Sequence, residues 1–171
     1  MDNAEKAYAY ARNKAKQDMD KFSIGIDPGA SGCVVVLSHG ADPAICRMKT
    51  SPQCEVIDFL RGYVNGTAHV ALEQVASSPQ MGVRSAFTFG QGYGWLEGVL
   101  STLQLPFTYV RPQVWQKDLS IPKKKEKSQP EHKRVLVDKA RQLYPKEKIT
   151  ADVADALLIA HWCYFHCKEG Q

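Results

Sequence analysis

The chain has 171 residues, of which 44% are hydrophobic and 23% are charged. These values predict one soluble domain with a sizeable core, and they exclude a membrane span because Asp155 and His161 interrupt the longest apolar run. The five cysteines are an odd number and favour reduced, buried thiols in a cytoplasmic compartment of a bacterial or phage-infected cell, or of an organelle. Acidic residues near the start and no hydrophobic signal core argue against a secretory or transit peptide.

The net charge of +4 is distributed unevenly. Residues 111–148 contain 12 Lys and Arg against 5 Asp and Glu, whereas the rest of the chain contains 10 against 13. A basic segment on a mildly acidic chain favours a polyanionic partner, most simply nucleic acid. A solvated, charged loop and helix face explains the same pattern, so both interpretations stay open.

The first elements in chain order predict a helix followed by an antiparallel unit. Residues 1–20, rich in Ala, Lys and Gln, predict an exposed N-terminal helical extension. Two apolar runs, Phe22–Ile26 and Cys33–Leu37, flank a Pro-Gly turn at hairpin spacing, and Ala44–Met48 is typical of a third strand.

The next strand places a second acid near the first. A helix that begins at Pro52, with Ser51 as its N-cap, separates the hairpin from the short run His69–Leu72. Strand–helix–strand spacing predicts that this run is parallel to the first strand, so Asp27 and Glu73 would share the edge at which open α/β sheets bind ligands. For Asp27 alone, a role as the cap of the Pro-Gly turn is an equally good explanation.

A long helix, Arg84–Leu103, carries glycine at positions 90, 94 and 98, on one stripe. Each glycine weakens a helix by about 1 kcal/mol, so the stripe indicates a close approach by another element. Packing of the helix on the sheet and contact with a second subunit or nucleic acid are equally good explanations.

The basic part of the chain predicts a last strand at Phe107–Val110, a short helix at Pro112–Leu119 and an amphipathic helix at Glu131–Tyr144. A lysine-rich loop lies between the two helices. Trp115 is more typical of a packing anchor than of a base-stacking platform.

The final helix, Ala151 to about His166, begins after the N-cap residue Thr150. Asp152 and Asp155 are three residues apart and therefore project from the same side of its first turns. The helix dipole is sufficient to explain Asp152, whereas Asp155 lies deeper in an apolar stretch.

Four acids, Asp27, Glu73, Asp152 and Asp155, could therefore converge. Such a cluster would repel itself severely without divalent metal, and oxygen ligands favour Mg²⁺ or Mn²⁺. Two bound ions suit phosphodiester hydrolysis. The His- and Cys-containing end of the last helix, residues 161–167, matches no standard zinc spacing, and it is better explained as a core helix end.

The motifs IGIDPGASG, LEQV and DVADALLIA, in this order, resemble the RuvC-type Holliday junction resolvases of the ribonuclease-H-like superfamily. The resemblance covers about residues 22–163. It implies an α/β fold, in which helices flank a mixed five-stranded sheet whose first three strands are antiparallel. The nuclease domain with this fold would comprise residues 21–171. It also implies a homodimer that makes paired symmetrical nicks in four-way junction DNA, with two Mg²⁺ per active site, replaceable by Mn²⁺.

The same resemblance assigns roles to particular residues. The metal-binding catalytic acids would be Asp27, Glu73, Asp152 and Asp155, and Lys127 in the sequence EKSQ would act near the scissile phosphate. The expected DNA contacts are Lys117, Lys123, Lys124, Lys125, Lys127, Met81 and Arg84. Met81 is the one bulky apolar candidate for the residue that wedges into a junction, and either Trp115 or Lys117 takes the place of a second basic residue.

Three other functions fit parts of the sequence. A related ribonuclease-H-like nuclease of the YqgF type would act on RNA or non-junction DNA. An actin-like or sugar-kinase ATPase shares the Ile-Gly-Ile-Asp-Pro-Gly loop, but the chain lacks a second phosphate segment and the necessary length. A module that binds junctions without cutting them is the third alternative, against which the four acids argue.

Overall fold

The computed structural model describes residues 21–29, 31–64, 67–75, 81–122 and 128–167. Its elements in chain order are β1 (Lys21–Asp27), β2 (Cys33–Ser38), β3 (Ala44–Arg47), α2 (Gln53–Arg61), β4 (Thr67–Glu73), α3 (Val83–Thr102), β5 (Phe107–Val110), α4 (Pro112–Asp118), α5 (Gln129–Leu143) and α6 (Ala151–His166). The expected N-terminal extension and the lysine-rich loop lie outside the described residues. Within the described ranges, every helix is too short or too polar to span a bilayer.

The strands form one mixed five-stranded sheet in the order β3-β2-β1-β4-β5. The pairs β1–β2 and β2–β3 are antiparallel, whereas β1–β4 and β4–β5 are parallel, which confirms the predicted topology. In the parallel pair, Ile26 lies opposite Leu72, so the residues that follow each of them, Asp27 and Glu73, end at the same edge of the sheet.

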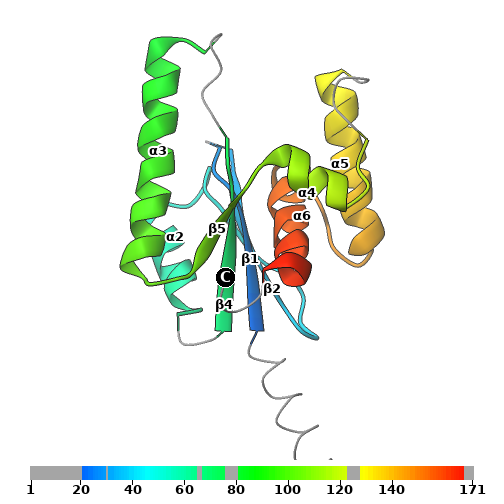
Figure 1. The fold of residues 1–171 in the computed structure, drawn as a ribbon, viewed down its shortest axis with the longest axis horizontal. Coiled ribbons are helices and arrows are strands. Elements are labelled where there is room, and N and C mark those ends of the chain that lie inside the picture. Colours follow the sequence, from blue (N-terminus) through cyan, green and yellow to red (C-terminus); the bar gives the residue numbers. More distant parts are fainter. Residues whose placement is uncertain (1–20, 30, 65–66, 76–80, 123–127, 168–171) are drawn as a thin grey trace, which may run out of the picture.

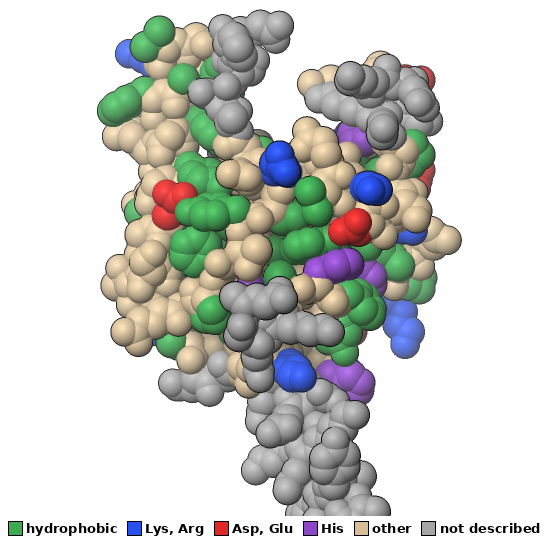
Figure 2. Space-filling model, viewed as in Figure 1, with side chains coloured by type: hydrophobic (Ala, Val, Ile, Leu, Met, Phe, Trp, Pro, Cys, Tyr) green, Lys and Arg blue, Asp and Glu red, His purple; other side chains and the backbone are tan. Residues whose placement is uncertain are grey.

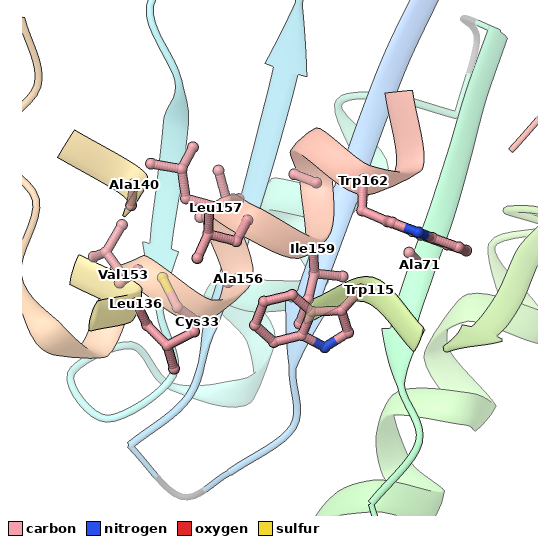
Figure 3. Packing of buried hydrophobic residues seen from close by; sticks show 14 of the residues in the cluster. Cys33, Ala71, Trp115, Leu136, Ala140, Val153, Ala156, Leu157, Ile159 and Trp162 are labelled. Carbon is pink, nitrogen blue, oxygen red and sulfur yellow. The ribbon is translucent and has the colours of Figure 1, made fainter. Parts of the chain in front are cut away.

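Alternate strand residues supply two separate cores because successive side chains point to opposite faces. On one face, Ile24 and Leu72 pack in a cluster with residues of α2 and α3. On the other face, Cys33 and Ala71 pack with residues of α4, α5 and above all α6, as Figures 1 and 3 show. Helix α6 is thus held directly over the centre of the sheet.

Two glycines of the first hairpin fix this arrangement. A Cβ atom on Gly25 would lie 2.2 Å from both the Ala156 carbonyl oxygen and the Ala160 nitrogen, so strand β1 and helix α6 touch backbone to backbone. A Cβ on Gly32 would lie 2.0 Å from the Asp27 carbonyl oxygen, so the turn closes only with glycine there. The two contacts set where Asp27 lies relative to α6.

Helix α3 corrects one interpretation of the sequence. Its buried residues are Leu96, Val99 and Leu100, whereas Cβ atoms on the stripe glycines, at positions 90, 94 and 98, would meet nothing within 4 Å. Packing on the sheet therefore does not explain the stripe, which lies on an exposed face.

Helix α2 begins one residue later than expected. Its N-cap residue is Pro52, not Ser51, and its C-cap residue is Gly62. The Ser51 amide donates to the Arg47 carbonyl oxygen at 3.0 Å, so this residue belongs to the turn after β3.

Candidate active site

The first acid, Asp27, lies at the end of β1 and is partly buried. Its Oδ1 accepts a hydrogen bond from the Gly29 amide at 3.2 Å, so it does cap the turn, as the simpler explanation expects. Burial, with a contribution from the nearby Asp155, nevertheless raises the pKa of the Asp27 carboxyl, while Gly29 and the charge of Lys133 act against that rise. A capping role therefore does not explain why the Asp27 carboxyl is buried close to a second acid, Asp155.

The second acid, Glu73, is buried at the end of β4, with only 8% of its surface exposed. The indole nitrogen of Trp115, on α4, donates to Glu73 Oε1 at 2.9 Å. Burial raises the pKa of Glu73 to about 7, and the charges of Asp27 and Asp155 add to the rise. Trp115 is itself 1% exposed, so it acts as a packing anchor that orients Glu73 and does not offer a face for base stacking.

The third acid, Asp155, projects from α6 toward these two strand ends. Its Oδ2 accepts from the Lys133 ammonium group at 2.7 Å. Its other oxygen, Oδ1, is buried and accepts no hydrogen bond from the described residues. A carboxylate oxygen desolvated in this way is costly without a compensating cation or donor.

Lys133 is the residue of this site that the sequence did not reveal. It lies on α5, and its charge acts on both strand-end acids, Asp27 and Glu73, as well as on Asp155. In the sequence it is one of several polar residues on an amphipathic helix. Its spacing carries no signal because its partner lies 22 residues away.

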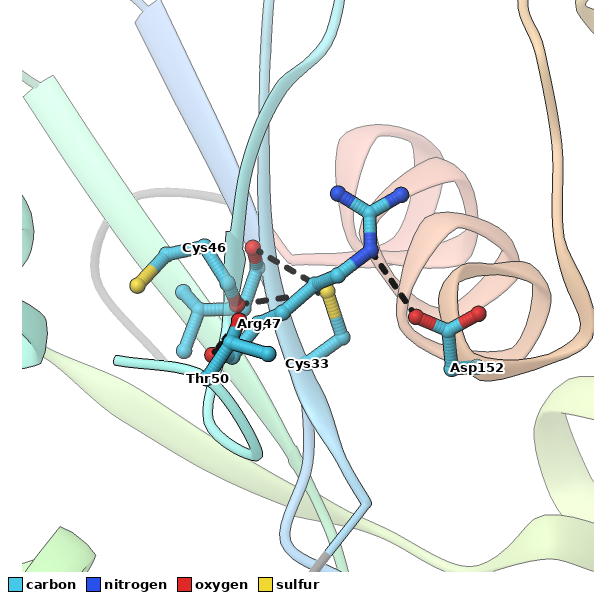
Figure 4. Close-up of polar contacts among 6 residues, drawn as sticks. Cys33, Cys46, Arg47, Thr50 and Asp152 are labelled. Atoms are coloured by element: carbon cyan, nitrogen blue, oxygen red, sulfur yellow. Dashed lines mark hydrogen bonds and ion pairs between the residues drawn. The ribbon is translucent and has the colours of Figure 1, made fainter. Parts of the chain in front are cut away.

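Asp152 is arranged differently from the other three acids. Figure 4 shows its Oδ2 accepting from Arg47 Nε, at 2.9 Å, across the gap between α6 and β3. The Thr150 hydroxyl, followed by Arg47, holds the pKa of Asp152 below its ordinary value. The charge of Asp152 is not among those that act on Asp27 or Glu73, so the structure brings three of the four predicted acids together and pairs the fourth with arginine.

Among the described residues, no three His, Cys, Asp or Glu side chains already lie in the arrangement of a metal site. The donor set nevertheless fits a hard divalent cation. It contains three carboxylates, two of them with raised pKa values, and the unpartnered Oδ1 of Asp155. At present Lys133 supplies the compensating positive charge.

A cavity of about 920 Å³ opens beside Glu73 and Asp155, between α4 and α5. Lys117, one of the expected DNA contacts, lines it together with Lys133. Figure 2 shows that the molecule is hollowed at this end, between the α3 side and the α5 side.

The other expected DNA contacts are divided. Met81 and Arg84 are exposed at the start of α3. Lys123, Lys124, Lys125 and Lys127 lie outside the described residues.

The high pKa of Glu73 predicts a pH-dependent stability in EDTA. The folded state binds the proton more tightly than the unfolded state, whose Glu pKa is about 4.3. The free energy of unfolding should therefore fall as pH rises from about 4.5 to about 7, by about 3 kcal/mol from this group.

Thermal unfolding of wild type and Glu73→Gln across this range measures the effect. The glutamine can still accept the Trp115 hydrogen bond, so we expect the variant to be the more stable protein at about pH 8 and to lose that advantage toward about pH 4.5. If the stabilities of the two proteins changed with pH in the same way, ionisation of Glu73 would not destabilise the folded state.

Comparison with known proteins supports the fold. No protein-family model matches the chain, and no curated relative matches it by sequence. Two solved structures of Thermus thermophilus RuvC, the first in complex with Holliday junction substrate, match with a TM-score of 0.51 each and sequence identities of 19% and 20%. Each match covers 81% of this chain and 90% of the other, so the chain has a RuvC-like fold.

Proposed function

We propose that this protein is a metal-dependent endonuclease that resolves four-way DNA junctions, acting in the cytoplasm during recombination or repair. The observation that carries the proposal is the convergence of Asp27, Glu73 and Asp155 from β1, β4 and α6, with Lys133 among them. The RuvC-like fold supports it, since a neighbouring structure holds a Holliday junction substrate.

Each charged residue has a place in this proposal. Asp27, Glu73 and Asp155 would hold Mg²⁺, and bound divalent ions supply an activated water and stabilise the charge on the leaving oxygen. Lys133, which pairs with Asp155 here, would help to neutralise the scissile phosphate. Asp152 would join the site only by leaving Arg47.

The lysine-rich segment has a separate role. Lys117, Lys123, Lys124, Lys125 and Lys127 would hold the phosphate backbone without reading sequence, and Lys127 could also reach the scissile phosphate. Met81 and Arg84, exposed at the start of α3, would contact the junction arms.

Nicking of a synthetic four-way junction tests the proposal. With Mg²⁺ or Mn²⁺ we expect paired nicks at symmetrical positions in opposed strands, and with EDTA no nicks. Linear duplex of the same sequence and a matched RNA serve as controls. Equal cleavage of either control would favour the YqgF-type alternative, and junction binding without any cleavage would make the protein a binding module.

Symmetrical nicking requires two active sites, and α3 offers the face for a dimer. The exposed side chains of Val83 and Phe87 continue into the stripe formed by glycines 90, 94 and 98. Such small residues allow another helix backbone to approach closely, and the exposed aromatic ring supplies apolar area. We propose that a second copy of the chain covers this face.

Gly94→Glu should convert the dimer to a monomer, because the new side chain places bulk and charge on the proposed contact. Since nothing lies within 4 Å of a Cβ there, the fold itself should tolerate the change. Light scattering during size-exclusion chromatography measures the mass. The control is Ser85→Glu. This residue lies on the opposite side of the same helix from Gly94, so the variant should remain a dimer.

If Gly94→Glu remained a dimer, the two subunits would not meet at this face of α3.

A further inference from the structure

A second group of reactive side chains lies at the end of α6 remote from the acids. Cys163 is buried in the last turns of this helix, and Cys167 is its half-buried C-cap residue. Helix α6 runs the length of the sheet in Figure 1, with Asp155 near its first turn and these two thiols near its last. The nuclease proposed above uses neither cysteine.

Four side chains from three elements lie near one another here. Cys163 of α6, His69 of β4 and Thr108 of β5 all lie close enough to the Cys167 thiol to lower its pKa. The His69 Nε2 and Thr108 Oγ1 atoms are 2.9 Å apart, and the Cys163 thiol donates to the His69 carbonyl oxygen at 3.4 Å. The two cysteines are adjacent across the last turn of α6, and His69 lies beside both of them.

The surroundings of the two sulfur atoms make their acidities different. The neighbouring Cys163 thiol, followed by His69 and Thr108, lowers the pKa of Cys167 below its ordinary value. The proximity of Cys167, together with burial, raises the pKa of Cys163. Cys167, which is half-buried, is therefore the more accessible and the more acidic thiol, whereas Cys163 is buried. Because thiolates are the nucleophilic form of cysteine, Cys167 is the one suited to attack.

We propose that Cys163 and Cys167 are a redox-active thiol pair, in which Cys167 reacts with hydroperoxides and Cys163 resolves the oxidised product as a disulfide. The Cys167 sulfur attacks the terminal oxygen of the hydroperoxide and the O–O bond breaks. The departing alkoxide, or hydroxide in the case of hydrogen peroxide, takes a proton from solvent and leaves as an alcohol or as water. The sulfur is oxidised to a sulfenic acid while the peroxide oxygen is reduced. The Cys163 sulfur then attacks it, an S–S bond forms, the S–O bond breaks, and the Cys163 proton leaves with the hydroxide as water.

The backbone permits this bond. The Cys167 amide donates to the Cys163 carbonyl oxygen at 2.9 Å, which sets the Cα atoms about 6 Å apart, within the range of disulfides. Cys167 has already left the helical conformation, at φ −91° and ψ 108°, so its side chain is not held by helix geometry.

The first test is the pH dependence of alkylation in the full-length folded protein. With iodoacetamide and peptide mass spectrometry, we expect the rate at Cys167 to change less than about threefold between about pH 6 and about pH 8, where an ordinary exposed thiol gains about tenfold per pH unit. Cys54, which is exposed, is the internal control. His69→Phe should give Cys167 the steep profile, and a steep profile for Cys167 in wild type would overturn the proposal.

The second test uses dilute hydrogen peroxide on the native protein. Wild type should lose the mass of two hydrogen atoms, in a peptide that links Cys163 to Cys167. Cys163→Ser keeps a hydrogen-bond donor and should accumulate a sulfenic acid at Cys167 that a 1,3-diketone traps, while Cys54→Ser should behave as wild type. Oxidation that begins at Cys54, or a disulfide that joins other cysteines, would contradict the assignment.

Discussion

Asp155→Asn should reduce junction cleavage by about 10³-fold, which corresponds to about 4 kcal/mol of transition-state stabilisation. Asp155 is the acid whose charge acts on both Asp27 and Glu73, and it also holds Lys133. The amide keeps the shape of the side chain but cannot supply a negative charge to a divalent ion. Junction affinity, measured by fluorescence anisotropy in Ca²⁺, should change by no more than a few fold. The residues proposed to hold the DNA phosphate backbone lie elsewhere in the chain.

The matched control is Asp58→Asn, which removes an exposed acid that pairs with Arg61 on α2. It should cleave at the wild-type rate. A second variant, Asp155→Asn with Lys133→Met, separates the loss of a metal ligand from the presence of an unpaired lysine, and it should be as inactive as the single variant. Cleavage by Asp155→Asn within tenfold of wild type would exclude the three-acid mechanism.

The placement of Asp27 and Glu73 could be predicted from the sequence because local patterns determine it. Each acid follows a buried apolar run, and the helix between the runs requires the two strands to be parallel. Observed strands extend the expected ones by a residue or two, as at Lys21–Asp27 and Thr67–Glu73, and this does not move the acids from the shared edge.

The partners of the acids could not be predicted in the same way. Arg47 and Asp152 are 105 residues apart, and Trp115 and Glu73 are 42 apart, so no periodicity links them. Each contact depends on how α4 and α6 lie against the sheet. The expected four-acid cluster included both Asp152 and Asp155 because they share a helix side, whereas in the structure Asp152 pairs with Arg47 and Asp155 pairs with Lys133.

The contact that decides this packing is the one between Gly25 and α6. Gly25 lies two residues before Asp27 in β1, and it allows the backbone of the strand to touch the helix at Ala156 and Ala160. Since Asp155 immediately precedes Ala156, the same contact sets the separation of the two acids. The motif Ile-Gly-Ile-Asp therefore has a packing role in its glycine and a chemical role in its aspartate.

Gly25→Ala should destabilise the protein by about 4 kcal/mol or more, because the new methyl group cannot fit 2.2 Å from two backbone atoms of α6 unless strand and helix separate. Thermal unfolding should show a midpoint lowered by more than about 10 °C. Gly92→Ala is the control, since it adds the same methyl group inside α3 with nothing within 4 Å, and it should raise stability by up to about 1 kcal/mol. Equal midpoints for the two variants would mean that β1 and α6 do not touch as described, and the convergence of Asp27 with Asp155 would lose its structural basis.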